Sequence, residues 1–148
     1  MTARVLVLNG PNLGELGRRE PEIYGAQTHD DLIAACTATA TELGLSVEVR
    51  QTDEEATYIG WLHEASRTGV DALILNPAAW THTSVAIRDA AAALSAPYVE
   101  VHLSNPLRRE EFRHVSFTAS QAFGIVAGFG VESYLLALRA LAAHLARG

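Results

Sequence analysis

The residues best suited to chemistry lie in a segment that fits neither a helical nor a strand pattern, Asn9 to Tyr24, which reads NGPNLGELGRREPEIY. Gly10 tolerates unusual backbone dihedrals and Pro11 fixes its own, so a tight turn should hold the Asn12 amide in one place. Two arginines, an acid and a tyrosine follow the turn. This segment therefore carries more polar chemistry than any other part of the chain.

The length of this segment is a second signal. Roughly twenty residues separate Asn9 from the expected helix start at Thr28, whereas compact α/β domains usually connect a strand to a helix in about two to six residues. The segment contains several large apolar residues and lacks the low hydrophobicity of disordered chains. We therefore predict a lid over a binding site, at about residues 10–27.

A second group of polar residues follows buried strand patterns further along the chain. Asn76 precedes Pro77, and taken alone it would be an ordinary turn residue. His82 falls near the start of an expected helix, and His102 and Ser104 follow the strand-like run YVEVH. The backbone N–H groups of Leu103 and Ser104 precede a short helical start at Asn105-Pro106, where a carboxylate or a phosphate would be favoured.

Glu100 and His102 alternate along the same expected strand and so share one face, which suits a carboxylate that orients an imidazole for acid/base work. A metal site would need a third ligand, and the sequence contains neither HExxH nor a cysteine pair, so we expect no metal. Asp89 follows Arg88 within an expected helix, and in isolation it resembles a solvated ion pair.

The remaining titratable groups are expected to be structural. Cys36 falls in an apolar helical pattern and should pack as a small core residue. Four histidines lie on expected helix faces or in segments without convergent polar partners: His29, His63, His114 and His144.

Apolar periodicity then predicts the elements that must position these groups. Five strands are expected, at residues 4–8, 45–50, 72–75, 98–102 and 124–127. Helices are expected at 28–43, from a capping pair Thr52 and Glu55 to Gly69, at 81–94, and from about 131 to the end. Strands alternating with helices indicate a flavodoxin-like parallel sheet, order 2-1-3-4-5, covered on both faces. Ligands bind such sheets beyond the carboxyl ends of the strands, here between strands one and three, where the polar residues named above should converge.

Composition narrows the class of protein. The chain has 148 residues, 49% of them hydrophobic, which predicts one domain. The net charge of −6 argues against a nucleic-acid surface, so we expect a small-molecule ligand. No apolar run reaches the length of a signal-peptide core or a membrane span, and we expect a cytoplasmic protein without membrane contact. All 11 basic residues are arginine, which rules out a lysine Schiff base and a GK[ST] phosphate loop.

Three motifs in order, NGPNLGELGRREPEIYG, NPAAWTHTSVAIRDA and VEVHLSNPLRREEFR, resemble the type II 3-dehydroquinases, the 3-dehydroquinate dehydratases of the shikimate pathway. The resemblance spans essentially the whole chain. It implies a flavodoxin-like subunit in a homododecamer built from trimers, and anti elimination of water from 3-dehydroquinate through an enolate, without metal or cofactor.

The resemblance also implies roles for individual residues. The catalytic set would be Tyr24 as general base at C2, Arg19 as its activator, His102 as the acid for the C1 hydroxyl, and Asn12 as holder of a water at the enolate oxygen. Glu100 would orient His102. The substrate carboxylate would be held by Asn76 with the backbone of Leu103 and Ser104. The ring hydroxyls would be held by His82, Arg113 and Asp89, the last from a neighbouring subunit.

Two positions depart from the family pattern. Pro77-Ala78-Ala79 replaces a glycine-containing form, and Ser133 stands where glycine is usual, so local backbone shape is in question there. The alternative from another class is a flavodoxin-like binding module, for a flavin phosphate or as a phospho-acceptor receiver. A receiver needs paired acids at the end of strand one, where this chain has Leu8-Asn9-Gly10, and a flavin would show visible absorbance.

Overall fold

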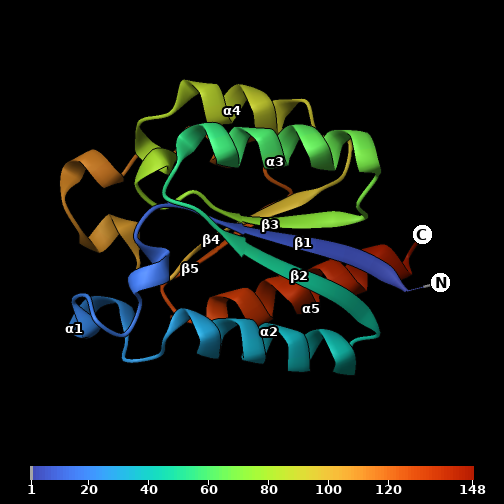
Figure 1. Cartoon of the computed structure of the whole chain (residues 1–148), viewed down its shortest axis with the longest axis horizontal. Coiled ribbons are helices and arrows are strands. Elements are labelled where there is room, and N and C mark those ends of the chain that lie inside the picture. The colour runs from blue at the N-terminus through green and yellow to red at the C-terminus, as the bar shows by residue number, and fades with distance from the viewer. Residues whose placement is uncertain (1) are drawn as a thin grey trace.

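The computed structural model, which describes residues 2–148, contains one five-stranded parallel sheet in the order β2-β1-β3-β4-β5. The strands are β1 (Ala3–Asn9), β2 (Leu45–Gln51), β3 (Ala72–Asn76), β4 (Tyr98–His102) and β5 (Gly124–Ala127). The longer helices are α2 (His29–Glu42), α3 (Glu55–Thr68), α4 (Val85–Ala92) and α5 (Glu132–Ala146). Figure 1 shows α3 and α4 on one face of the sheet and α2 and α5 on the other. The predicted flavodoxin-like order is confirmed.

The central strands are buried on both faces because both faces are covered by helices. Four consecutive residues of β1, from Val5 to Leu8, are at most 3% exposed, and all five positions of β3 and of β4 are buried. The two faces form separate clusters, with Leu32 and Leu138 in one and Leu62 and Ile87 in the other. The continuous apolar runs read from the sequence are therefore central strands, as expected of a parallel sheet.

Short segments follow the carboxyl ends of β1, β3 and β4, at the end of the molecule opposite both chain termini (Figure 1). They include η1 (Leu13–Glu15), α1 (Pro21–Tyr24), η2 (Ala78–His82), η3 (Pro106–Arg108) and η4 (Glu111–Arg113). A further short segment, η5 (Ala119–Gln121), leads from η4 back to the start of β5. Leu13 and Leu16 are each only 6% exposed, so the first part of the long segment after β1 is packed against the body of the protein, while most of residues 17–27 are exposed.

The start of α2 agrees with the expectation, and the start of α3 does not. The capping box at the start of α2 is confirmed, since Thr28 and Asp31 each accept the other's backbone N–H. The predicted capping pair before α3 is wrong: α3 begins only at Glu55, and the Thr52 hydroxyl instead accepts the N–H of Glu54. Both arrangements satisfy a local backbone donor, and the sequence pattern alone does not separate them.

The third predicted helix, 81–94, is likewise two elements. Residues 78–82 form η2, and α4 begins at Val85 with Ser84 as its cap, accepting the N–H of Ile87. His82 therefore lies at the end of a 3-10 segment and not in the first turn of the helix. Within residues 2–148, no helix is both long enough and apolar enough to cross a membrane.

Candidate active site

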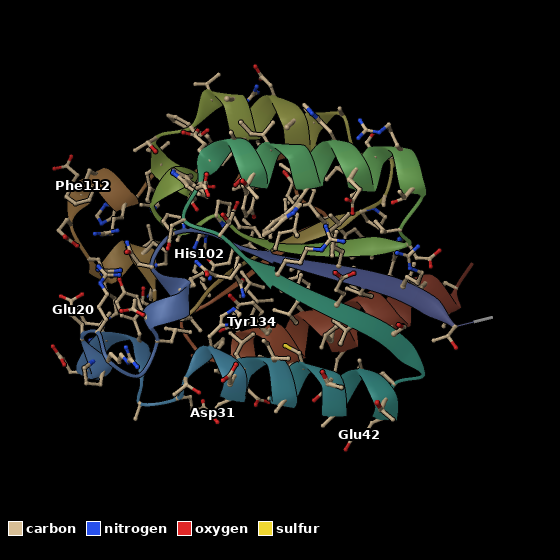
Figure 2. All side chains as sticks on the ribbon, viewed as in Figure 1. Glu20, Asp31, Glu42, His102, Phe112 and Tyr134 are labelled. Atoms are coloured by element: carbon tan, nitrogen blue, oxygen red, sulfur yellow. The ribbon has the colours of Figure 1, made fainter. Side chains whose placement is uncertain are left out.

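A pocket lies at the carboxyl ends of β1, β3 and β4, where the sequence predicted a crevice. Nine of the expected residues line it: Asn12, Arg19, Tyr24, Asn76, His82, His102, Leu103, Ser104 and Arg113. Figure 2 shows His102 at the end of the sheet that faces the segments carrying Glu20 and Phe112. Residues from four separate stretches of the chain thus meet at one site.

The other two expected residues, Glu100 and Asp89, do not line this pocket. Glu100 is 1% exposed and lies behind His102. The Asp89 side chain is 67% exposed and lies 3.4 Å from Arg88, as its sequence neighbourhood suggested. Within one subunit, Asp89 is therefore not part of the site.

The turn after β1 depends on close contact with the turn after β3. A Cβ atom on Gly10 would lie 2.5 Å from the carbonyl oxygen of Pro77, so only glycine fits between the two turns. Asn12 adopts a left-handed conformation with φ of 69°, and its N–H donates to Asp53 at 2.8 Å. These contacts hold Asn12 at the rim of the pocket, as the sequence predicted.

Glu100 and His102 form a buried pair. Nε2 of His102 lies 2.8 Å from the Glu100 carboxylate, which also accepts hydrogen bonds from the hydroxyls of Ser116 and Thr118. Burial raises the pKa of Glu100, but the hydrogen bond and charge of His102, with the two hydroxyls, outweigh it and lower that pKa overall. Glu100 is therefore an anion that accepts Nε2–H of His102, leaving Nδ1 for proton exchange.

His82 lies beside this pair, with its ring centroid 6.5 Å from that of His102. Nδ1 of His82 donates to the carbonyl oxygen of Val115 at 2.9 Å. Burial and the charges of His102 and Arg113 lower its pKa, against the raising effects of the Val115 hydrogen bond and Glu100. His82 is therefore a neutral imidazole at pH 7, and its free Nε2 can accept a hydrogen bond from a hydroxyl group.

Tyr24 lies between two cations, one of which the sequence reading missed. The guanidinium carbon of Arg19 is 5.7 Å from the centroid of the Tyr24 ring, and that of Arg109 is 5.2 Å away. Arg109 also lines the pocket and donates weakly to the Ser104 hydroxyl at 3.4 Å. It stands inside the motif VEVHLSNPLRREEFR, so the sequence signal was present, but only the fold brings it to Tyr24.

Arg113 is held from outside the pocket by Glu110. Nε of Arg113 donates to the Glu110 carboxylate at 3.0 Å, and the guanidinium lies 4.9 Å from the ring centroid of Phe112. Because this contact uses Nε, the two terminal amino groups remain for a ligand. A guanidinium held in this way can bind paired oxygens of a ligand in a defined direction.

The positions that depart from the family pattern have visible structural consequences. Ala78 has a φ of 54°, a left-handed conformation that favours glycine, and its N–H donates to Oδ1 of Asn76 at 3.1 Å. The Ser133 hydroxyl, buried in α5, accepts the N–H of Phe129 at 3.0 Å. The first departure thus carries backbone strain, and the second adds a hydrogen bond to the loop after β5.

Three of the other side chains have more contacts than the sequence suggested. His29 lies 3.1 Å from the amide nitrogen of Asn9, and His114 lies 3.0 Å from the Arg109 carbonyl oxygen. His144 packs against Phe123.

Burial raises the pKa of Cys36 to about 12, so this thiol is an unreactive core group. Among residues 2–148, no group of three or more potential ligands is placed to hold a metal ion.

Residues 3–142 match the family model described as dehydroquinase class II. A 3-dehydroquinate dehydratase of Salinispora tropica is 58% identical over 141 residues, covering 95% of this chain and 98% of the relative, and one of Kineococcus radiotolerans is 55% identical over 145 residues, covering 98% and 99%. The crystal structure of type II dehydroquinase from Propionibacterium acnes, 53% identical, superimposes with a TM-score of 0.93 over 97% of this chain and 98% of that one. The chain belongs to the class II dehydroquinase family.

Proposed function

We propose that this protein is a 3-dehydroquinate dehydratase of the shikimate pathway, which converts 3-dehydroquinate to 3-dehydroshikimate by anti elimination of water. The observation that carries the proposal is the pairing of groups in one pocket. A phenol beside two guanidiniums and an imidazole backed by a buried carboxylate both line it. This arrangement can remove a proton at one carbon and donate one to an oxygen on the next.

In the proposed reaction, Tyr24 acts as the base. A phenol is almost entirely protonated at neutral pH, so a useful phenolate needs a neighbouring positive charge. Arg19 and Arg109 supply two. The phenolate takes the proton from C2, and the electron pair of that C–H bond forms the enolate with the C3 carbonyl. Asn12 would hold a water against the enolate oxygen.

The second step expels the C1 hydroxyl. The enolate re-forms the C3 carbonyl, a double bond forms between C1 and C2, and the C1–O bond breaks. His102 gives the departing oxygen a proton from Nδ1, so that water leaves. Glu100, which accepts Nε2–H, stabilises the protonated imidazole before this transfer.

The remaining residues would bind the substrate. Asn76 and the backbone N–H groups of Leu103 and Ser104 would hold its carboxylate, and His82 and Arg113 its ring hydroxyls. Asp89 would reach the site of a neighbouring subunit, since it lies outside the pocket of its own. Residues 10–27 would act as a lid, because they carry Arg19 and Tyr24 to the pocket.

The same proposal includes a homododecamer built from trimers, located in the cytoplasm. Large apolar side chains exposed by 50–68% support self-association: Leu107, Phe112, Val115, Phe123, Ile125 and Phe129. Cell fractionation tests the location, and light scattering tests the assembly.

The deciding experiment is an ultraviolet assay of purified protein with 3-dehydroquinate. The product is a conjugated enone, so its absorbance should rise with time, and Tyr24→Phe should abolish the rise at equal protein concentration. Variant protein that matches the parent by circular dichroism serves as the control for folding. A parent protein that produces no enone at saturating substrate would contradict the proposed function.

A further inference from the structure

A buried chain of hydrogen bonds runs from the pocket to the start of α2. The N–H of Ala78 donates to Oδ1 of Asn76 at 3.1 Å, and Nδ2 of Asn76 donates to the Tyr134 hydroxyl at 2.8 Å. The Tyr134 hydroxyl donates to Oδ1 of Asn9 at 2.7 Å, and Nδ2 of Asn9 lies 3.1 Å from Nε2 of His29. The chain thus links residues of β3, α5, β1 and α2.

The three central members are removed from water, so their hydrogen bonds cannot be replaced by solvent. Asn9 and Tyr134 are 0% exposed and Asn76 is 3% exposed. A buried amide or hydroxyl left without its partner is strongly unfavourable. Each member therefore constrains the next.

The donor and acceptor in each of these hydrogen bonds follow from the Ala78 end of the hydrogen-bond chain. A backbone N–H can only donate, so Ala78 requires the oxygen of Asn76, and the amide nitrogen of Asn76 must face Tyr134. The single hydroxyl proton of Tyr134 then goes to the oxygen of Asn9. The amide nitrogen of Asn9 consequently faces His29, whose Nε2 must accept.

His29 fits this requirement. Burial lowers its pKa, against the raising effect of Asp30, which favours the neutral ring that the chain needs. Burial likewise raises the pKa of Tyr134, so its hydroxyl keeps the proton that it donates to Asn9. Neutral His29 with its proton on Nδ1 completes the chain without two donors facing each other.

The consequence for the site lies in the second hydrogen of the Asn76 amide. One hydrogen goes to Tyr134, and Oδ1 is occupied by Ala78, so what Asn76 can offer the pocket is an N–H. A rotated amide would offer an oxygen, which repels a carboxylate. We propose that Tyr134, with Asn9 and His29 behind it, is a positioning residue that fixes the Asn76 amide with its N–H toward the substrate carboxylate. This inference rests on the proposed function for its ligand.

Tyr134→Phe tests the proposal, because it removes the hydroxyl and keeps the ring. We expect the KM for 3-dehydroquinate to rise about tenfold, equivalent to about 1.4 kcal/mol, since a misoriented Asn76 would lose its hydrogen bond to the charged carboxylate. The value of kcat should stay within about threefold, because the groups that move protons are untouched. Tyr58→Phe is the matched control: Tyr58 is also 0% exposed and donates to a buried partner, the Leu8 carbonyl, at 2.9 Å, but it has no link to Asn76. It should lower thermal stability similarly and leave KM unchanged.

A double-mutant cycle separates positioning from general damage. In an Asn76→Ala background, Tyr134→Phe should raise KM no further, because the amide that it orients is gone. The same rise in both backgrounds, or no rise in the parent, would overturn the proposal.

A measurement without substrate keeps the two proposals separate. Nitrogen NMR of the parent protein labelled with ¹⁵N-histidine at pH 7 should show His29 protonated on Nδ1 and unprotonated on Nε2. A His29 that carries its proton on Nε2 would overturn the direction of the chain, whether or not the protein dehydrates 3-dehydroquinate. Absence of activity with the expected tautomer would instead count against the proposed function alone.

Discussion

At the residue scale, Arg109 lies beside the Tyr24 ring, whereas its sequence neighbour Arg108 does not line the pocket. Arg109→Ala should lower kcat by about 10- to 100-fold, part of the 10²–10⁴ that a positioned base contributes. Residual activity should increase in alkaline solution, because a phenol that has lost one of its two nearby cations is harder to ionise. Arg108→Ala, an exposed arginine outside the pocket, is the control and should stay within about twofold. Steady-state assays across pH measure both, and equal losses in the two variants would remove the role of Arg109.

We expect the buried carboxylate of Glu100 to make the free energy of unfolding depend on pH in the acid range. Its pKa is lowered in the folded protein, so the stability it contributes is present above the pKa of an unfolded glutamate, about 4.3, and is lost as pH falls through the folded value. Between pH 5 and pH 3, the parent should therefore lose more free energy of unfolding than Glu100→Gln, which has no carboxylate to titrate.

Urea unfolding followed by circular dichroism over this pH range measures the difference. Glu110→Gln is the control for an exposed carboxylate. The pKa of Glu110 is also lowered, by its hydrogen bond with Arg113, but Glu110 lies on the surface, so this variant separates the effect of a buried carboxylate from that of a surface ion pair. Parallel pH profiles for the parent and Glu100→Gln would contradict the prediction.

At the scale of elements, the proposed lid has a tight contact between its middle and its C-terminal end. Gly17 has a φ of 88°, and a Cβ atom there would lie 3.1 Å from both the Ala26 carbonyl oxygen and the Thr28 methyl group. Gly25 has nearly the same φ, 89°, but no atom within 4 Å of an added Cβ. Alanine at either site is strained by the positive φ, at a cost of about 1–3 kcal/mol, and only Gly17 adds a steric conflict.

We therefore expect Gly17→Ala to lower kcat/KM about tenfold more than Gly25→Ala does, because the displaced segment carries Arg19 and Tyr24. Limited proteolysis should also cut Gly17→Ala faster between residues 10 and 27. Equal kinetic losses would mean that the contact of Gly17 with the C-terminal end of the lid does not position the catalytic groups.

At the scale of the whole molecule, the position of Asp89 predicts a composite site. Asp89→Ala and Tyr24→Phe should each be nearly inactive alone, and mixing them under conditions of subunit exchange should restore activity. Each mixed assembly would contain sites with an intact Tyr24 from one subunit and an intact Asp89 from another. Exchange is verified by mass spectrometry of differently labelled subunits, and a mixture of His102→Ala with Tyr24→Phe, both in the same pocket, is the control that should recover nothing. No recovery after verified exchange, or a fully active monomer by light scattering, would contradict the shared site.

The sequence by itself determined the features that depend on signals spanning only a few residues. Apolar runs identified the central strands β1, β3 and β4 because both sheet faces are covered there. The Thr28 and Asp31 pair identified the start of α2 because the two ends of that motif are three residues apart. The motifs also identified the pocket residues, because parallel strands bring their carboxyl ends to one edge.

The tertiary structure alone decided the contacts between distant residues. Tyr134 and Asn9 are 125 positions apart and no local pattern pairs them, yet their hydroxyl and amide meet because α5 packs on the sheet beside α2. Arg109 reaches Tyr24 because the segments that follow β4 and β1 come together at one end of the sheet. A hydroxyl or a guanidinium has many possible partners in an unfolded chain, and only the packed sheet and helices select one, because burial makes every other choice leave a polar group unpaired.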